Sequence, residues 1–314
     1  MLLPAGPRAI ARAAQRLREG GVVAFPTETV YGLGALAFDA VAVARVFEIK
    51  QRPSFDPLIV HVADRAMLDD VAAAIPAAAQ LLIERFWPGP LTLVLSKRTV
   101  VPDLVTAGLR SVAVRMPSHP VARALIEAVG APLAAPSANP FGRVSPTRAD
   151  RVARLLGDRV DLILDGGPAT YGLESTIVAL EPRPALLRPG AISAEEIEAV
   201  IGPLERTALS AIRAPGQLPQ HYAPSTPLRV IDPRQVPPHE RLHAGALTLS
   251  EPLEGYAALR LLSPRGDLRE AAANLFETLH ELDALGLERI DAAPVPERGL
   301  GLAIMDRLRR AAAR

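Results

Sequence analysis

Two cationic side chains of unlike chemistry stand two residues apart in the segment Lys50-Gln51-Arg52-Pro53. Of the 35 lysines and arginines in the chain, only Lys50 and Lys97 are lysines, so a lysine at this position needs its own explanation. Pro53 biases Arg52 toward an extended conformation, in which residues at i and i+2 point the same way. A compact ammonium and a planar guanidinium directed at one volume would suit a polyanion or an oxyanion. The alternative is an exposed helix end with a cationic last turn.

Neutral polar side chains and further arginines follow other apolar runs. Ser137 and Asn139 stand at i and i+2 between two prolines, which predicts a preorganised hydrogen-bonding pair at a strand end, where α/β proteins bind ligands. An ordinary Asn-Pro turn is the alternative. Arg115 and Arg188 each end an apolar run that is soon followed by proline. Together with the first two cations, these residues indicate a polar cavity for an anionic ligand.

Three weaker signals accompany them. His61 lies inside an apolar run, where a hydrogen-bonded core histidine is the ordinary expectation and a ligand contact the less common one. Ser175 follows a glycine-rich loop and leads into an expected strand. Gly32 and Gly34 match the loose dinucleotide fingerprint, but six residues separate them from the preceding strand. We therefore expect these glycines to form a turn or to allow close backbone approach to a ligand.

The composition excludes several classes of function. The 35 basic and 34 acidic residues give a net charge of +1, so no overall field favours nucleic acid or a membrane. The lack of cysteine excludes disulfides, thiolate catalysis and Cys-ligated metals, and the six histidines have no metal-ligand spacing. There is no P-loop sequence, no secretory signal and no apolar run of membrane-spanning length. We expect a cytoplasmic protein with a local anion site and no protein-bound metal.

Short apolar runs alternate with helical periodicity over the first two thirds of the chain, which predicts an α/β core. Helices are expected at residues 7–19, 39–50, 64–86 as a pair, 118–129 and from 193. Strands are expected at residues 22–25, 58–62, 91–95, 111–115, 133–135, 161–164, 176–180 and 185–188. We predict a domain of residues 1–204, a Pro-rich linker of residues 205–226, and a smaller α/β domain of residues 227–314. In the latter, strands are expected at 228–231, 246–249, 259–262 and 289–295, with helices at 267–285 and 300–313.

In order and spacing, these motifs resemble the YrdC-domain family, specifically the long form of the threonylcarbamoyl-AMP synthases. The resemblance rests on Lys50-x-Arg52, on Ser137-x-Asn139 far downstream, and on the segments at 26–34, 57–61, 87–92, 175–177 and 187–190. Residues 221–224 and 299–305 are similar to the long form, which has an extra C-terminal domain. The resemblance implies an open α/β domain whose twisted sheet surrounds a large concave cavity, and a small Rossmann-like second domain.

The implied reaction converts L-threonine, bicarbonate and ATP into threonylcarbamoyl-adenylate and pyrophosphate. The product would pass to separate transfer proteins that modify N6 of the tRNA adenosine beside the anticodon, and a weak direct tRNA contact is a further expectation. Mg²⁺ would bridge the ATP phosphates without a dedicated set of protein ligands.

The resemblance also assigns roles to individual residues. Lys50 and Arg52 would be the catalytic cations, placed at the ATP phosphates and the carbamate. Threonine would be held by Thr27, His61, Arg115 and Ser175. The nucleotide would be held by Lys50, Arg52, Ser137, Asn139, Ser145 and Arg188. Tyr222 would either cover the cavity as a lid or pack as a linker tyrosine. Residues 217–220 are uncharged where long forms are usually basic, which leaves phosphate contacts from the linker open.

Two other functions were weighed. A structured-RNA-binding module would use a basic concave face, but the net charge is near zero and aromatic residues are few. A carbamoyl-transfer domain of the hydrogenase-maturation type would bring acylphosphatase-like and zinc-finger parts, which this sequence lacks.

Overall fold

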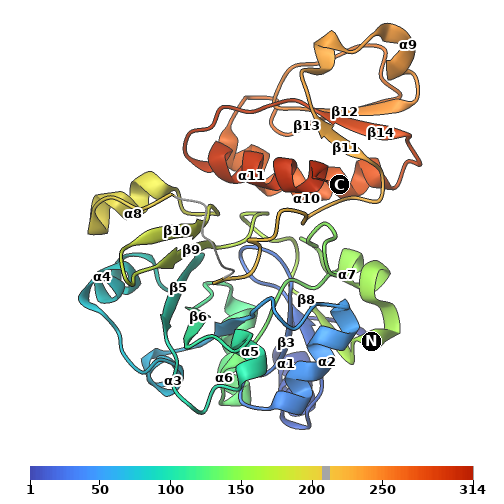
Figure 1. The fold of residues 1–314 in the computed structure, drawn as a ribbon. Helices are drawn as coiled ribbons and strands as arrows, with labels where there is room; N and C mark the ends of the chain where they lie inside the picture. The colour runs from blue at the N-terminus through green and yellow to red at the C-terminus, as the bar shows by residue number, and fades with distance from the viewer. Residues whose placement is uncertain (207–212, 314) are drawn as a thin grey trace.

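The computed structural model describes residues 1–206 and 213–313, which form two α/β parts (Figure 1). Residues 207–212 of the predicted linker and residue 314 lie outside the described residues. The large part is built on ten strands: β1 (Leu2–Pro4), β2 (Val23–Phe25), β3 (Gly32–Leu36), β4 (Ile59–His61), β5 (Leu91–Ser96), β6 (Ser111–Arg115), β7 (Leu133–Ala134), β8 (Leu162–Asp165), β9 (Thr176–Ala179) and β10 (Ala185–Arg188). Their order in the sheet is β1-β8-β2-β3-β7-β4-β6-β5-β9-β10, with parallel and antiparallel neighbours mixed.

Helices cover this sheet, and several of them begin at a residue whose side chain caps the first turn. They are α1 (Pro7–Arg18), α2 (Ala40–Lys50), α3 (Arg65–Val71), α4 (Ala77–Phe86), α5 (Asp103–Thr106), α6 (Pro120–Val129), α7 (Ala149–Leu156), the 3₁₀ turn η1 (Gly157–Arg159) and α8 (Ala194–Ile201). The Asp39 side chain accepts hydrogen bonds from the first turn of α2, and Ser193 with Glu196 forms the predicted capping box of α8.

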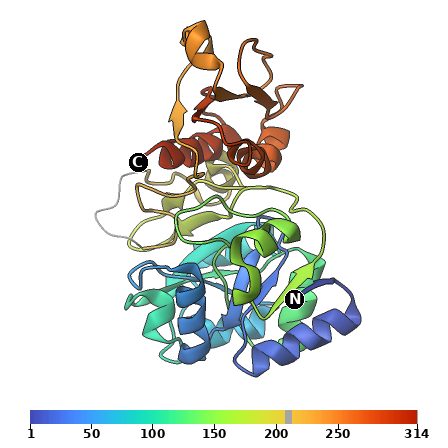
Figure 2. The ribbon, with the colours of Figure 1, turned by 90° about the vertical axis from the view of Figure 1, so that its right-hand side faces the viewer.

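The small part is a parallel sheet with the strand order β11-β14-β12-β13. Its elements are β11 (Leu228–Val230), η2 (Pro233–Gln235), α9 (Pro238–Arg241), β12 (Ala244–Thr248), β13 (Ala258–Leu261), α10 (Leu268–Asp283), β14 (Arg289–Ala292) and α11 (Leu300–Ala312). In both ribbon views α10 and α11 lie between the small sheet and the large part (Figures 1 and 2). The predicted α/β class with a second, smaller α/β part is confirmed.

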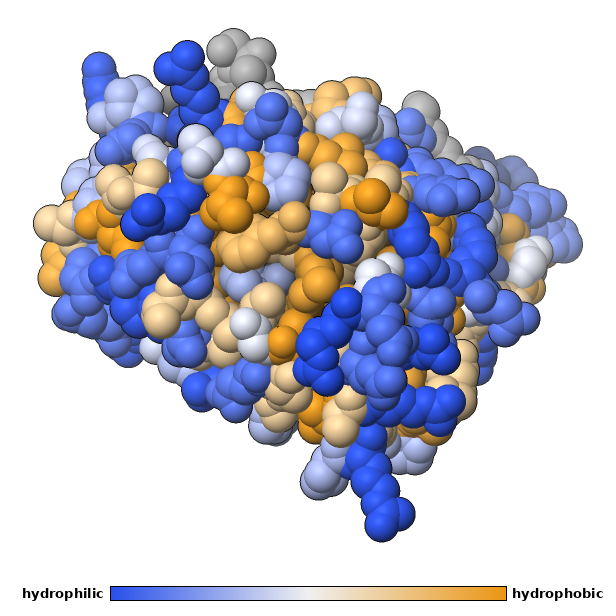
Figure 3. Space-filling model, turned by 90° about the horizontal axis from the view of Figure 1, so that it is seen from below, coloured by the Kyte–Doolittle hydropathy of each residue, from blue (hydrophilic) through white to orange (hydrophobic). Residues whose placement is uncertain are grey.

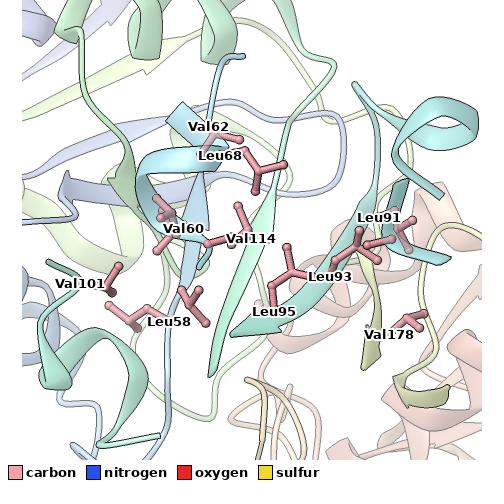
Figure 4. Packing of buried hydrophobic residues seen from close by; sticks show 14 of the residues in the cluster. Leu58, Val60, Val62, Leu68, Leu91, Leu93, Leu95, Val101, Val114 and Val178 are labelled. Carbon is pink, nitrogen blue, oxygen red and sulfur yellow. The ribbon is translucent and has the colours of Figure 1, made fainter. Parts of the chain in front are cut away.

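The main core of the large part explains why its central strands read as continuous apolar runs. Val60, Val114 and Leu93 come from the neighbouring strands β4, β6 and β5, and Leu91 and Val178 extend the cluster along β5 and β9 (Figure 4). All five are fully buried. Burial of one such side chain contributes about 1.5–3 kcal/mol, so this cluster fixes the strands whose ends carry the polar residues.

One expected turn is a strand. Residues 32–36 form β3, which pairs antiparallel with β2 and β7. A Cβ atom on Gly34 would lie 2.6 Å from the ring of Phe25, so the glycine allows a close approach of packed side chains within the sheet. The sequence reading also did not anticipate β1, α5, α7 and α9, of which three have only three or four residues.

On the surface of the large part that faces away from the small part, hydrophobic residues are interspersed with hydrophilic ones (Figure 3). Within residues 1–206 and 213–313, no helix has both the length and the apolar character needed to cross a membrane.

Candidate functional site

A cavity of about 50 Å³ lies between strand ends of the large sheet and the linker residues Pro215, Gly216, His221 and Tyr222. It brings together eight of the eleven predicted site residues. These are Thr27, Arg52, His61, Arg115, Ser137, Ser175, Arg188 and Tyr222. The other three predicted residues, Lys50, Asn139 and Ser145, do not line it. The cavity therefore lies at strand ends, where the sequence predicted a ligand site.

Arg115 holds one side of the cavity in a network of buried polar groups. Its Nη2 lies 2.6 Å from Glu28 Oε1, and its Nη1 donates to Thr29 Oγ1 over 2.8 Å. Thr29 in turn shares a 2.8 Å hydrogen bond with the Thr27 hydroxyl. Among the described residues, Nε of Arg115 has no hydrogen-bond acceptor. A guanidinium fixed on two sides with one donor left over can bind a carboxylate.

His61 is the register partner of Arg115 on the neighbouring parallel strand and is 3% exposed. Burial and the charge of Arg115 lower the pKa of His61 to about 3, so its imidazole is neutral near pH 7. Its Nδ1 has no hydrogen-bond partner in the described part of the chain. His61 is thus buried as expected of a core histidine, with backbone hydrogen bonding to Ile59 and Leu133, and its unpaired Nδ1 can interact with a ligand.

Replacement of His61 by glutamine should change the acid dependence of stability. The pKa of His61 lies near 6.5 in the unfolded chain and is lowered by folding, so between the two values the unfolded chain binds more protons. Between pH 7 and pH 5, the free energy of unfolding should therefore fall by about 2 kcal/mol more in the wild-type protein than in His61→Gln. Urea unfolding at both pH values measures the difference, with His239→Gln, a change at an exposed histidine, as the control. Parallel pH dependences in wild type and His61→Gln would contradict the prediction.

Lys50 has a different environment from the one predicted. It is the last residue of α2, and Gln51 has a left-handed backbone conformation with φ of 54°, so the two cations do not share one face of an extended segment. Lys50 is 1% exposed, which also contradicts the exposed helix end. Its Nζ donates to the carbonyl oxygens of Ser137 over 2.6 Å and of Asn139 over 2.5 Å. The lysine thus holds the backbone of the Ser137-x-Asn139 segment.

Arg52 reaches the cavity from the segment that follows. Its Nη2 lies 2.9 Å from Asp56 Oδ2 and donates to the Pro57 carbonyl over 2.8 Å, while Nε donates to the Asp56 carbonyl over 3.0 Å. The guanidinium carbon is 5.9 Å from the centre of the Phe141 ring. These contacts fix a cation at the cavity wall before any ligand binds.

The nucleotide residues predicted downstream are divided between the cavity and the interior. Ser137 lines the cavity, whereas Asn139 and Ser145 are fully buried. The Asn139 amide nitrogen donates to the carbonyls of Pro140 and Arg143, and the Ser145 hydroxyl donates to Glu174 over 2.6 Å. The side chains of Asn139 and Ser145 therefore do not line the cavity, and their hydrogen bonds stabilise the residues that form its wall.

Arg188 orients Ser175. Its Nε and Nη2 donate to the Ser175 carbonyl over 3.0 and 2.9 Å, and Nη2 also contacts the Ser175 hydroxyl at 3.0 Å. That hydroxyl shares a 2.8 Å hydrogen bond with Thr92. Burial lowers the pKa of Arg188, which marks it as a desolvated cation.

The linker covers the cavity with Tyr222. This residue is 1% exposed, has a left-handed backbone conformation with φ of 63°, and stacks on Phe276 of α10 with ring centres 5.7 Å apart. A Cβ atom on Gly216 would lie 2.6 Å from the Tyr222 hydroxyl, and Gly216 itself has φ of 80°, so only glycine fits there. Tyr222 thus packs as a linker tyrosine and also lines the cavity, and its role as a lid stays a prediction.

Four buried polar atoms of residues that line this cavity have neither a hydrogen-bond partner nor an ion-pair partner among the described residues. They are His61 Nδ1, Arg115 Nε, His221 Nδ1 and the Tyr222 hydroxyl. A buried polar atom without a partner costs about 1–3 kcal/mol, so four around one cavity indicate groups prepared for a ligand.

Sequence reasoning missed three polar residues that line the cavity: Thr29, Glu174 and His221. Each is close in sequence to a predicted residue. Thr29 is two residues from Thr27, and the other two precede Ser175 and Tyr222 directly. The contact with Arg115 that makes Thr29 part of the site joins residues far apart in sequence, so it left no local signal.

The fold and the cavity define a class: an α/β protein with a cavity of fixed arginines and polar side chains at strand ends beneath a linker, with a second α/β part packed on top. Comparison with known proteins narrows this class. A family model described as "Telomere recombination" matches residues 15–190, and one described as "Threonylcarbamoyl-AMP synthase, C-terminal domain" matches residues 192–313. The chain belongs to the threonylcarbamoyl-AMP synthase family.

Individual relatives are similar to this chain over nearly its whole length. Threonylcarbamoyl-AMP synthase of Pyrococcus abyssi is 45% identical over 316 residues, covering 95% of this chain and 92% of the relative. The enzyme of the same name from Bacillus subtilis is 45% identical over 320 residues, covering 96% and 92%. The crystal structure of P. abyssi Sua5 complexed with L-threonine has a TM-score of 0.92 and 42% identity, covering 99% of this chain and 96% of that one.

Proposed function

We propose that this protein is an L-threonylcarbamoyladenylate synthase, a nucleotidyltransferase that acts in the cytoplasm. Its substrates would be L-threonine, bicarbonate and ATP, and its products threonylcarbamoyl-AMP, pyrophosphate and water. The proposal is supported by full-length relatives of that name and by a cavity that combines fixed arginines with unpaired buried polar atoms.

The chemistry needs two steps at one place. The threonine amine first attacks the bicarbonate carbon, and loss of water gives a carbamate. A carbamate oxygen then forms a bond to the α-phosphorus of ATP, and the bond from that phosphorus to the bridging oxygen breaks as pyrophosphate leaves. Both steps gain from substrates held in place and from cations at the developing charge, and no covalent enzyme intermediate is required.

We assign the substrate ends from the geometry of the cavity. Arg115 would hold the threonine carboxylate through its unpaired Nε, Thr27 and Ser175 would contact threonine from elsewhere in the cavity lining, and neutral His61 would contact the threonine amine or hydroxyl. Arg52 and Arg188 would face the nucleotide phosphates, with Ser137 at the nucleotide. Lys50, Asn139 and Ser145 would stabilise the cavity wall without contacting substrate, and Lys50 would do so by fixing the loop that carries Ser137.

We propose that Mg²⁺ arrives with ATP. In the described ranges, no three His, Cys, Asp or Glu side chains are close enough together to hold a metal ion. The three carboxylates nearest the arginines are also engaged, since Glu28, Asp56 and Glu174 pair with Arg115, Arg52 and Arg307. An ion held by phosphates and water is the usual arrangement for Mg²⁺.

The product would be a reactive mixed anhydride, so it must be consumed by acyl transfer. We propose that separate threonylcarbamoyl-transfer proteins take it to tRNA, and a weak tRNA contact of this chain is retained as a prediction.

The activity itself is tested by incubating the protein with Mg²⁺, ATP, threonine and labelled bicarbonate. We expect pyrophosphate release that depends on threonine, and label in an adenylate. Reactions without threonine, or with serine in its place, serve as controls. Pyrophosphate release without threonine dependence, or no release over a range of Mg²⁺ concentrations and temperatures, would show that the proposed function is wrong.

A further inference from the structure

The second domain places a charged side chain at the back of the cavity. Arg307 on α11 is 0% exposed, and it is the largest of the fully buried side chains in the described part of the chain. The ribbon views show α11 at the boundary between the two parts (Figures 1 and 2). A guanidinium is almost never buried this completely unless it is paired, so its partners identify what it does.

Two of its contacts belong to the cavity, whereas its Nη1 pairs with Asp306 on the same helix over 2.6 Å. Nε of Arg307 lies 2.9 Å from Glu174 Oε2, and Glu174 lines the cavity next to Ser175. The other Glu174 oxygen accepts the 2.6 Å hydrogen bond from Ser145. The guanidinium carbon of Arg307 is 4.9 Å from the centre of the Tyr222 ring. One side chain of the second domain thus contacts both a wall residue and the covering tyrosine.

The charge of Glu174 matters because cations stand close by. Burial lowers the pKa of Lys50, and the negative charge of Glu174 acts against that lowering. The same two effects apply to Arg188. Glu174 is therefore near enough to influence Arg188, which we assign to the nucleotide phosphates, and Lys50, which fixes the loop that carries Ser137. Without a counter-ion, its carboxylate would weaken the attraction of Arg188 for phosphate, since charges in a desolvated site are poorly screened.

We infer that Arg307 is a positioning residue of this cavity: by holding and neutralising Glu174, the second domain makes the cavity able to accept the phosphates of ATP. This inference rests on the proposed function. It gives the second domain a part in substrate binding, although none of its strands or helices lines the cavity. The backbone of α11 adds to this arrangement, because the Arg310 carbonyl accepts a hydrogen bond from the linker residue His221.

The test compares Arg307→Gln with Glu174→Gln and with the double variant in steady-state pyrophosphate release. Arg307→Gln should raise KM for ATP about tenfold or more and change KM for the zwitterion threonine less, because the Glu174 carboxylate is then uncompensated and repels phosphate. The double variant has no uncompensated charge and should return KM for ATP to within about threefold of wild type. Arg309→Gln is the matched control, because Arg309 lies on the same helix as Arg307 and only an exposed ion pair with Glu297 is broken, so this variant should behave as wild type.

Arg307→Gln also loses stability, because it leaves a buried carboxylate without its cation. If this variant does not fold, Glu174→Gln decides, since loss of the carboxylate leaves the charge of Arg307 in excess and should lower KM for ATP about threefold or more, with a smaller change in KM for threonine. An unchanged or higher KM for ATP in Glu174→Gln, an equal rise of both KM values in Arg307→Gln, or a double variant as impaired as Arg307→Gln would overturn the inference. An inactive wild-type protein would instead refute the proposed function, so the two failures can be told apart.

Discussion

Lys50→Met should lose at least about 100-fold in kcat/KM for ATP and about 2–4 kcal/mol in the free energy of unfolding. The side chain is buried, and its Nζ is the hydrogen-bond donor to the carbonyls of Ser137 and Asn139. Methionine keeps the volume but leaves two buried acceptors unpaired, so the loop that carries Ser137 should move. Pyrophosphate release and urea unfolding measure the two effects.

Lys97→Met is the matched control. Lys97 pairs with Asp103, whose side chain is 83% exposed, and it lies outside the cavity. We expect a change of at most about 1 kcal/mol in stability and no change in kcat/KM. Similar losses in the two lysine variants would show that Lys50 has no special role.

Arg115→Lys and Arg52→Lys should affect different substrates. Arg115→Lys keeps a positive charge near Glu28 but loses the fork that joins Thr29 and leaves Nε for a carboxylate, so KM for threonine should rise about 10–100-fold. Arg52→Lys should instead raise KM for ATP by a similar factor, because a single ammonium cannot replace the contacts to Asp56 and the Pro57 carbonyl and still face the phosphates.

Both KM values are measured for both variants by pyrophosphate release at saturating levels of the other substrate. Arg65→Lys, at an exposed arginine that pairs with Asp69 on α3, provides the control for a change of cation at the surface. If Arg115→Lys raised KM for ATP as much as KM for threonine, the division of the cavity into a threonine side and a nucleotide side would be wrong.

The sequence predicted most of the elements that position the site, because their signals are local. Caps such as Asp39 and the Ser193 capping box are patterns of a few residues, and the buried strands read as apolar runs. Strand β3 was missed because glycines usually indicate a turn. Gly34 in this strand allows close packing against Phe25 on the neighbouring strand. Such a contact depends on how the strands pair, which local sequence patterns do not show.

The candidate site was predicted as a set of residue types, and the structure shows which of them reach the cavity. Nothing local in the sequence distinguishes Ser137, which lines the cavity, from Asn139, which turns inward to loop carbonyls. Likewise, no local signal in the sequence shows that the side chains of Ser145 and Lys50 contact buried partners and do not line the cavity. Arg307 carried no signal at all, because its partner Glu174 is 133 residues away in the chain.

The strand order of the large sheet has a consequence for how the protein folds. Strand β1 pairs with β8, so Leu2 lies beside Ile163, and β5 pairs with β9 although some eighty residues separate Leu91 from Thr176. Sheets that join such distant segments fold slowly, on a scale of about milliseconds to seconds, because long loops must close before native contacts form. The residues around the cavity come from all along these segments, so they should become neighbours only late in folding. A folding intermediate would then have almost no affinity for substrate, and threonine or ATP should stabilise only the native state.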